Sequence, residues 1–380
     1  MVTQLGTLRK IKKKRVLALS LGGPGSGVQS VYTEVSAAKW EVLSQAFLPY
    51  PQKLIEKLSV LSASDNAPVT LQDLSFVENR MTSLVTECAS STLAQVAGTY
   101  SRPHLAVLGR LFLWKGLIDD SDQQKRGLFS LCNPQSLCAA VRVPVFTDIV
   151  PVDWTANGKN DQYIASGMAR IGKKTGGVCV FVNIGLVCRM IITDSSTDEI
   201  VLDSDTGPGT CLINRVMHDC GTEGGIDRDG TLAAQGSVAN DCIESLAEEP
   251  WFQMPAPKTV YAGDLYPLLD KPCMKNLPTP DRIATVTALT ARTIYNFFKR
   301  EYKGQKAVNA VYVTGGGAHN QTLFEYLKMH FDPIPVNSTD TLGISPDLFI
   351  PLALGISAAA ALDRGAGNPM LIGTCSSEIG

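Results

Sequence analysis

A glycine-rich segment in the second half of the chain has the residue types of a phosphate-binding turn. Asp205-Thr206-Gly207-Pro208-Gly209-Thr210 follows apolar, strand-like residues at 199–203 and precedes a predicted helix over 211–217. Glycines let backbone N–H groups approach an anion closely, and a helix N-terminus adds partial positive charge. A carboxylate at the end of a strand can hold a hydrated metal ion. The segment therefore indicates a phosphate site with Asp205 placed for a metal.

Two further glycine turns follow predicted strands. Residues 308–314 read as a strand, Gly315-Gly316-Gly317 as a bend, and Ala318-His319-Asn320 as the entry to an amphipathic helix. Near the N-terminus, a buried strand over 16–21 runs into Gly22-Gly23-Pro24-Gly25-Ser26-Gly27. The turns at 205–210 and 315–317 together suggest a nucleotide held between them. Taken singly, either turn could be an ordinary connection or could only permit close packing of helix on sheet.

Length and composition indicate a packed globular protein of two domains. The chain has 380 residues, more than the length at which a single core keeps growing, and a cleft between domains is the default active site. Its net charge of −2 leaves no broad basic field, which argues against nucleic acid as a partner. We expect a basic arm over 1–15, domains over 16–176 and 177–365, and a tail over 366–380. The last helix of the second domain could also pack back on the first.

The apolar segments and the cysteines bear on location. No stretch reaches the roughly 20 apolar residues of a membrane span, and residues 16–21 are too short for a signal-peptide core. The ten cysteines are scattered singly, with no C-x-x-C pair and no spacing shared with histidine. Neither a zinc site nor a disulfide scaffold is therefore predicted. Buried thiols in a reducing compartment are expected, which predicts a cytoplasmic protein.

Apolar periodicity predicts an α/β fold in both halves. In the first half we expect two long helices, two short strands and a connecting helix, over 37–61, 71–100, 105–108, 143–146 and 135–141. In the second half we expect three consecutive strands and then three helices, over 178–183, 187–193, 199–203, 231–248, 281–302 and 346–362. Three strands followed by alternating helix and strand is the plan of a ribonuclease-H-like domain.

Several segments, in this order, resemble one known family. Asp205 to Thr210, then Asp227-Arg228-Asp229-Gly230 and Pro255-Ala256-Pro257-Lys258-Thr259, are similar to the 1,6-anhydro-N-acetylmuramic acid kinase family. Further matches are Val182-Asn183-Ile184-Gly185, Thr287-Ala288-Leu289-Thr290-Ala291, Gly315-Gly316-Gly317-Ala318-His319-Asn320 and Gly343-Ile344-Ser345. The resemblance extends from Val143 to Asn368 and is weak before it.

The resemblance implies an actin/hexokinase/Hsp70-like fold of two ribonuclease-H-like domains, with ATP and Mg²⁺ in the cleft between them. The family transfers the γ-phosphate of ATP to O6 of an anhydro amino sugar while water opens the 1,6-anhydro ring. A homodimer is also implied. Such chemistry needs a base for the water, a metal ion to neutralise phosphate charge, and backbone donors around the phosphates.

Residue roles follow by matching each motif. Two family aspartates lie five residues apart, which makes Asp153 the base that activates water and puts Asp148 in the sugar pocket. The resemblance also puts Asn183 with the substrate near the cleft floor. The residues that meet the nucleotide are Asp205 (also the metal ligand), Gly207, Pro208, Gly209, Gly315, Gly316, Gly317 and Asn320. Without the family match, Asp148 would read as a strand cap and Asp153 as an Asx turn. Asp227 and Asp229 are interpreted as a helix-entry loop.

The first glycine turn departs from the family pattern. The family has Gly-Thr-Ser-x-Asp-Gly-x-Asp where this chain has residues 22–29, without either aspartate and with Ser26 as a neutral substitute. Its amides are still expected to cradle phosphate, at Gly22, Gly23, Gly25, Ser26 and Gly27. The family's His-Gly-Gln-Thr segment and a Lys-Glu pair in the last helix are also replaced. Two hypotheses remain: an active sugar kinase with an altered pocket, or a non-catalytic relative that keeps nucleotide binding in a regulatory or interaction role.

Overall fold

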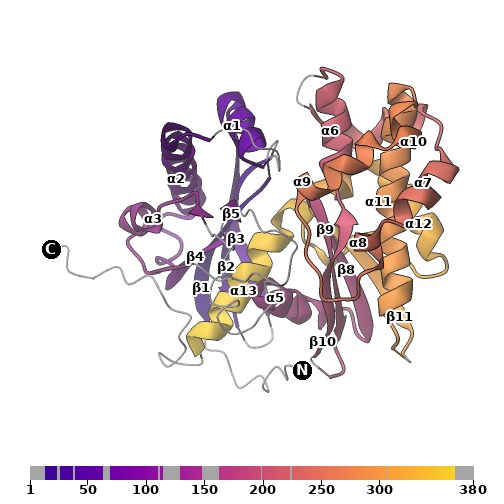
Figure 1. Ribbon diagram of the computed structural model, residues 1–380. Helices are drawn as coiled ribbons and strands as arrows, with labels where there is room; N and C mark the ends of the chain where they lie inside the picture. Colours follow the sequence, from indigo (N-terminus) through magenta and orange to yellow (C-terminus); the bar gives the residue numbers. More distant parts are fainter. Residues whose placement is uncertain are drawn as a thin grey trace, which may run out of the picture. The chain divides into compact units, whose positions relative to one another are not determined.

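The chain divides into two compact units. The computed structural model describes residues 13–23, 26–36, 39–62, 69–109, 112–113, 129–147, 162–197, 199–222, 225–304 and 306–363. The first unit contains the described residues up to 167 together with 350–363, and the second contains residues 168–349. Each unit has its own sheet (Figure 1).

The first unit is built on a five-stranded sheet in the order β3-β2-β1-β4-β7. The first three strands pair antiparallel in a meander, whereas β4 and β7 run parallel to β1. The strands are β1 Lys14–Leu21, β2 Gly27–Val35, β3 Trp40–Pro49, β4 Leu105–Gly109 and β7 Val145–Phe146. A separate two-stranded ribbon pairs β5 Phe112–Leu113 with β6 Phe129–Ser130.

Helices cover both faces of this sheet. Leu17 and Leu19 of β1 pack in one core with helices α1 Gln52–Ser62, α2 Leu71–Ala94 and α3 Pro134–Val141. Ala18, between those two leucines, faces α13 Phe349–Asp363 on the other side: a Cβ on Gly355 would lie 3.3 Å from the Ala18 Cβ. Because strand side chains alternate between faces, β1 is buried on both. α5 Gln162–Gly172 crosses α13 closely at Gly167.

The second unit repeats this topology. Its sheet has the order β10-β9-β8-β11-β12, with β8, β9 and β10 antiparallel and β11 and β12 parallel to β8. The strands are β8 Val178–Ile184, β9 Val187–Asp194, β10 Glu199–Pro208, β11 Val308–Thr314 and β12 Val336–Ser338. Each unit is thus a ribonuclease-H-like domain, and the predicted two-domain α/β architecture is confirmed.

Long helices of the second unit pack on one face of this sheet. α11 Thr279–Glu301 and α12 Gln321–Phe331 bury Ile294, Phe297 and Leu327 against Val180 and Val182 of β8. The remaining helical elements are α6 Cys211–Asp219, η3 Arg228–Gly230, η4 Ala233–Gln235, α7 Asn240–Ala247, α8 Pro250–Gln253, α9 Ala262–Leu265, η5 Tyr266–Asp270, α10 Pro272–Lys275, η6 Gly316–His319, η7 Thr339–Leu342 and η8 Pro346–Leu348.

Three element predictions were wrong. The helix expected over 37–61 is strand β3 followed by the short helix α1, because hydrogen bonds to β2 over Gly27–Val35 select the extended form. The helix expected over 231–248 is broken at Gly236, where a Cβ would lie 2.1 Å from the Pro280 carbonyl oxygen. The third error concerns Asp205 to Pro208, which belong to β10 rather than to a turn after it. The helices expected near 71–100, 135–141 and 281–302 are confirmed.

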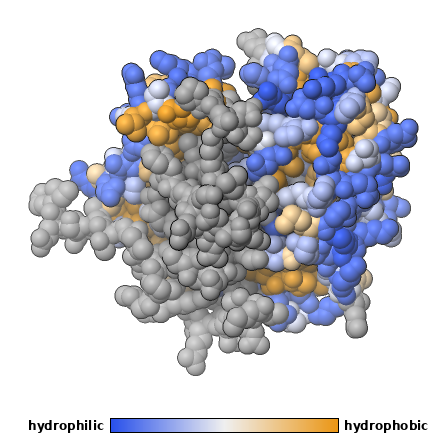
Figure 2. All heavy atoms as spheres, in the orientation of Figure 1, coloured by the Kyte–Doolittle hydropathy of each residue, from blue (hydrophilic) through white to orange (hydrophobic). Residues whose placement is uncertain are grey.

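The surface of the described residues is mixed. Figure 2 shows hydrophilic side chains over much of the coloured part of this face, with smaller apolar groups among them. The most exposed large apolar side chains are Leu71 and Met329, at 85% and 73% exposure. Among the helices that the structure describes, none has both the length and the apolar character required to cross a membrane.

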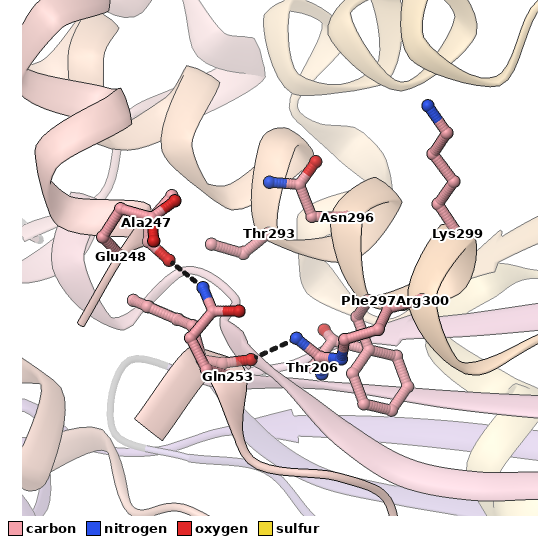
Figure 3. Close-up of a pocket in the computed structure, with 10 residues that line it drawn as sticks. Thr206, Ala247, Glu248, Gln253, Thr293, Asn296, Phe297, Lys299 and Arg300 are labelled. Atoms are coloured by element: carbon pink, nitrogen blue, oxygen red, sulfur yellow. Dashed lines mark hydrogen bonds between the residues drawn. The ribbon is translucent and has the colours of Figure 1, made fainter. Parts of the chain in front are cut away.

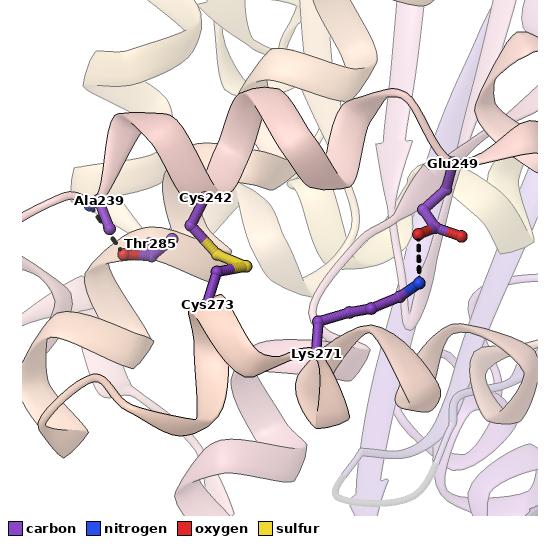
Figure 4. The surroundings of a disulfide bond; sticks show 6 residues. All are labelled: Ala239, Cys242, Glu249, Lys271, Cys273 and Thr285. Atoms are coloured by element: carbon purple, nitrogen blue, oxygen red, sulfur yellow. Dashed lines mark hydrogen bonds and ion pairs between the residues drawn. A yellow bond between two sulfur atoms is a disulfide. The ribbon is translucent and has the colours of Figure 1, made fainter.

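One prediction about the cysteines was also wrong, since Cys242 of α7 is joined to Cys273 of α10 by a disulfide (Figure 4). The two cysteines are 31 residues apart, and no cysteine-spacing pattern in the sequence predicts that they pair. Six of the other described cysteines are buried thiols, and Cys220 is exposed. The disulfide therefore fixes α7 to α10 within the second unit.

Removing this disulfide should destabilise the protein. For a loop of 31 residues, the chain-entropy account gives a loss of about 3–4 kcal/mol in the free energy of unfolding. We expect Cys242→Ser/Cys273→Ser to show this loss in denaturant unfolding, while Cys220→Ser changes stability by less than about 0.5 kcal/mol. Equal unfolding midpoints for the parent and the double variant, or full reactivity of all cysteines toward a thiol reagent without reductant, would contradict the pairing.

Candidate functional site

The candidate site of the second unit lies at the carboxyl ends of parallel strands β8 and β11. These strands are neighbours, and Asn183 of β8 pairs in register with Thr314 of β11. In open α/β sheets the carboxyl edge is where ligands bind, because the following turns leave backbone groups exposed there. The register therefore brings Asn183 beside the glycine turn at 315–317.

Each glycine of this turn has a distinct environment. Gly315 has φ +81°, and a Cβ there would lie 2.6 Å from the Asn183 Oδ1 atom and 2.8 Å from the Ile184 carbonyl oxygen. A Cβ on Gly317 would lie 2.2 Å from the Ile184 Cγ2 atom. A Cβ on Gly316 would meet no atom within 4 Å. Two glycines are therefore required by close packing on β8, and Gly316 faces open space.

Asn320 starts the helix after this turn. Its side-chain oxygen accepts a hydrogen bond from the Leu323 amide at 2.9 Å, and the side chain is buried. This is an N-cap, which satisfies an otherwise unpaired amide of α12. A Cβ on Gly230 would lie 2.2 Å from the same Asn320 oxygen. The cap of α12 and the loop at 227–230 therefore lie together.

The loop at 227–230 has a structural role for Asp227. Its two carboxylate oxygens accept hydrogen bonds from the amides of Leu232 and Ala233, at 2.9 and 3.0 Å. Both oxygens of the carboxylate are thus bonded to backbone amides, as expected for a helix-entry loop. Asp229 is exposed and has φ +57°.

A histidine–aspartate pair beside the glycine turn was not singled out from the sequence. His319 Nε2 lies 3.0 Å from Asp347 Oδ2, and this hydrogen bond raises the pKa of His319. The Pro346 carbonyl accepts hydrogen bonds from the Gly315 amide and the Thr314 hydroxyl, at 3.2 and 2.9 Å, which sets Asp347 beside the turn. The two residues are 28 positions apart, so no local pattern marked the pair.

The other glycine turn packs on the tip of the β8–β9 hairpin, Gly185–Leu186. The Leu186 carbonyl accepts from the amides of Gly209 and Cys211, and the Gly185 carbonyl accepts from the Thr210 amide, at 2.8–3.1 Å. A Cβ on Gly209 would lie 2.1 Å from the Gly185 oxygen. These three amides are therefore used within the protein, although the sequence suggested that such amides would face phosphate.

Gly207 and Pro208 complete β10 before this turn. Gly207 has φ +144°, and a Cβ there would lie 2.8 Å from the Phe252 ring. Pro208 is buried and pairs in register with Val187 of β9. Both residues therefore have packing roles, and they lie at the same edge of the sheet as Asn183.

Asp205 joins β10 to the segment at 258–260. Its Oδ2 atom accepts a hydrogen bond from the Val260 amide at 3.1 Å, and its own amide donates to the Lys258 carbonyl at 3.0 Å. Burial raises the pKa of Asp205 to about 6. The group is therefore largely charged at neutral pH but protonates more easily than an exposed aspartate.

Lys258 is buried behind this segment. Its ammonium donates to the carbonyls of Trp251 and Phe252, each at 2.9 Å, and lies 4.1 Å from the Trp251 ring centroid. Burial lowers the pKa of Lys258 to about 8. These bonds satisfy two carbonyls of the short helix α8, so Lys258 holds α8 next to Asp205.

A metal at Asp205 would have few protein ligands. Among the described residues, no group of three His, Cys, Asp or Glu side chains could hold a metal ion. Mg²⁺ often keeps several waters and takes only one or two carboxylates together with substrate phosphates. Asp205 offers one carboxylate oxygen besides Oδ2, so the residues present fit an ion bound mainly through phosphate and water.

The first glycine turn lies in the other unit, between β1 and β2. The Gly22 amide donates to the Gly27 carbonyl at 3.0 Å, and the Ser26 amide donates to the Gly23 carbonyl at 3.1 Å. Tyr50 fixes the turn further, because its hydroxyl donates to the Gly22 carbonyl. The turn is thus a closed, internally bonded hairpin connection. Gly25, the expected sugar-pocket residue Asp148 and the expected base Asp153 lie outside the described residues.

At one edge of the second sheet, then, the structure brings together Asn183, Gly207 to Gly209, Gly315 to Gly317 and Asn320. The hairpin tip contacts one glycine turn directly, and Ile184 beside it contacts the other. The sequence had given this tip no role of its own. The family-like segment Val182-Asn183-Ile184-Gly185, which ends at this tip, could have indicated its importance.

Comparison with known proteins identifies the family of this chain. The profile of the family described as anhydro-N-acetylmuramic acid kinase matches residues 14–378. A kinase of that name from Hahella chejuensis is 27% identical over 94% of this chain and 95% of its own, and one from Salinibacter ruber is 23% identical over 94% and 92%. The match to the kinase of that name from Nitrobacter winogradskyi is 34% identical and spans 60% of each chain. The chain belongs to the anhydro-N-acetylmuramic acid kinase family of sugar kinases.

Proposed function

We propose that the protein is an ATP-dependent phosphotransferase that phosphorylates O6 of a 1,6-anhydro-N-acetylmuramic acid-type sugar and opens its anhydro ring with water. The supporting observation is the shared edge of the second sheet, where both glycine turns pack against the β8–β9 hairpin. Family membership supplies the substrate class and the reaction. We further propose that the protein acts in the cytoplasm and forms a homodimer.

In this proposal the second unit binds the nucleotide. The open backbone at Gly316 and the N-terminus of α12 offer a place for the nucleoside, because a Cβ at Gly316 has free space around it. Asp205 holds Mg²⁺, which neutralises phosphate charge when it is bound. We assign phosphate contacts to those amides of the turn at 22–27, and separately to those of Gly207 to Gly209, that are not bonded within the protein. The amides of Gly22, Ser26 and Gly209 are bonded internally.

Asp153 supplies the base. Its carboxylate takes a proton from water, the water oxygen bonds to C1 of the sugar, and the C1–O6 bond breaks. O6 bonds to the γ-phosphorus of ATP, and ADP leaves as the bond to the β–γ bridging oxygen breaks. Asp148 and Asn183 orient the sugar. The alternative function, a catalytically impaired relative that binds nucleotide, is favoured by the neutral loop at 22–29 and by the internal bonds of its amides.

The two functions differ in the effect of one substitution. If the protein is an active kinase, Asp153→Asn should lower formation of the sugar 6-phosphate by about 10²–10⁴-fold, because a positioned base contributes that much. Its thermal stabilisation by Mg²⁺-ATP should be unchanged. The readouts are mass spectrometry of the product and the melting temperature. Asp270→Asn, at an exposed ion pair with Lys275, serves as the control.

The outcomes separate the hypotheses. Product from the parent and equal product from Asp153→Asn would remove Asp153 from the mechanism. Stabilisation by Mg²⁺-ATP with no product from the parent would support the impaired relative. The absence of any stabilisation would contradict both, because a ligand bound only by the native state must raise the melting temperature.

The glycine turn offers a matched pair of substitutions. Gly317→Ala should lower stability by about 1–3 kcal/mol, because its Cβ would overlap Ile184. Gly316→Gln should leave the melting temperature unchanged and weaken ATP binding, because its side chain enters the space left open there. Calorimetric titration with ATP and thermal unfolding measure the two effects. Unchanged ATP affinity in Gly316→Gln would place the nucleotide elsewhere.

The raised pKa of Asp205 predicts that the stability of the protein, free of metal and nucleotide, depends on pH. The native pKa of about 6 exceeds the ordinary value of 3.8, so the native state binds the proton more tightly. This contribution is present below pH 3.8 and is lost as pH rises through 6, a decrease of about 3 kcal/mol in the free energy of unfolding. Asp205→Asn should remove it. Parallel stability profiles of parent and variant from acid to neutral pH would disprove the expected shift.

A further inference from the structure

A groove runs between α7–α8 and α11 of the second unit. One part has a volume of about 370 Å³ and an adjoining part about 410 Å³, and both are lined by Ala247, Glu248 and Asn296. The shared lining makes them one continuous groove, of which Figure 3 shows the first part. Of its lining residues, only Thr206 belongs to a segment assigned to the nucleotide. The groove is large enough to take a small molecule.

The two walls of the groove carry opposite charges. On α11, Arg292, Asn296 and Lys299 are four and three residues apart and share one helical face. On α7, Glu244 and the adjoining Glu248 are four residues apart. Figure 3 shows Glu248 on one side of the pocket, with Asn296 and Lys299 on the other. The groove therefore offers cations along one wall and carboxylates along the other.

These charges are not used by the protein itself. Within the part of the chain that the structure describes, the side chains of Glu244, Glu248, Arg292 and Asn296 make no hydrogen bond or ion pair. Lys299 has only a contact with the Tyr295 ring, 5.8 Å from the ammonium to the centroid. The neighbouring Arg300, in contrast, donates to the carbonyls of Phe252 and Met254 and to Glu301. Two cations and two carboxylates are thus available to a ligand.

The floor between the charged walls is largely apolar. Ile243, Phe252 and Phe297 line it and are buried. Thr206 and Thr293 add hydroxyls, but these hydroxyls already donate to the carbonyls of Cys188 and Thr290. A ligand should therefore have polar ends and an apolar middle.

The α7 wall is held in place before any ligand binds. The Cys242–Cys273 disulfide ties α7 to α10, the Ala239 amide donates to the Thr285 hydroxyl at 3.1 Å, and Lys271 pairs with Glu249 at 2.6 Å (Figure 4). From the end of α8, the Gln253 side-chain amide donates to the Ala247 carbonyl at the end of α7, at 2.9 Å. A fixed wall lowers the entropic cost of binding.

We propose that this groove binds a zwitterionic small molecule, an amino acid or a short peptide. Its carboxylate lies toward Arg292 and Lys299, its ammonium toward Glu244 and Glu248, and its aliphatic part on the apolar floor. A simple anion would leave the two glutamates unpaired and would be repelled by them, and a simple cation would meet the same difficulty at the other wall. Only a molecule with both charges satisfies the two walls.

The dipeptide alanyl-alanine tests the charge requirement on the parent protein. N-acetyl-alanyl-alanine, which lacks the ammonium, and alanyl-alanine amide, which lacks the carboxylate, are its matched controls. Calorimetric or NMR titration should show binding of the free dipeptide and about three- to tenfold weaker binding of each capped form. No binding of the dipeptide at any soluble concentration, or equal binding of all three, would overturn the proposal.

Two variants test the location. Arg292→Gln should weaken binding of the free dipeptide about three- to tenfold but leave binding of alanyl-alanine amide unchanged, because the amide has no carboxylate for Arg292 to bind. Glu248→Gln should weaken binding of the free dipeptide but leave binding of N-acetyl-alanyl-alanine unchanged, because that molecule has no ammonium for Glu248 to bind. Glu325→Gln, which removes an exposed pair with Lys328 on α12, should bind like the parent. Equal affinities in the parent and both groove variants would place the dipeptide elsewhere. If either groove variant does not fold, the comparison of the free and capped dipeptides binding to the parent protein decides the proposal.

Discussion

The close approach of backbone to backbone at the β8–β9 hairpin is the constraint on which the candidate site depends. Ile184 leaves no room for a Cβ on Gly315 or Gly317, and Gly185 leaves none on Gly209. Glycines of two turns about a hundred residues apart, Gly209 in one and Gly315 and Gly317 in the other, are thus fixed by one short stretch of β8 and its turn. The parallel register of β8 and β11 makes this contact possible, because it sets both strand ends at one edge.

A second constraint is the attachment of the segment at 258–260 to the edge strand β10. Ser204 and Asp205 bond to the backbone of this segment, and Lys258 reaches the end of α8. Burying a carboxylate and an ammonium is costly unless each has hydrogen-bond partners. Both groups have them, and their shifted pKa values, about 6 and about 8, show the remaining cost. The short helix α8 is thereby held beside the strand end.

The sequence predicted the architecture better than the site. Alternation and helical periodicity located most strands and long helices, because these signals are local. They failed over 37–61, where apolar spacing suited a helix but pairing with β2 imposed a strand. The Cys242–Cys273 disulfide and the His319–Asp347 pair depend on the fold, since neither spacing has a local signature. The glycine turns were found, but which amides remain free could not be read from residue types.

Which glycines of the turns are required by packing, and which are not, bears on where a ligand can bind. Packing alone accounts for Gly207, Gly209, Gly315 and Gly317, because each is pressed against another chain segment. Gly316 is the glycine of this edge for which packing gives no reason. At Gly316 the backbone is open to a ligand, whereas the first turn lacks both aspartates of the family pattern. Nucleotide binding thus rests on fewer assumptions than turnover, because it does not need those carboxylates.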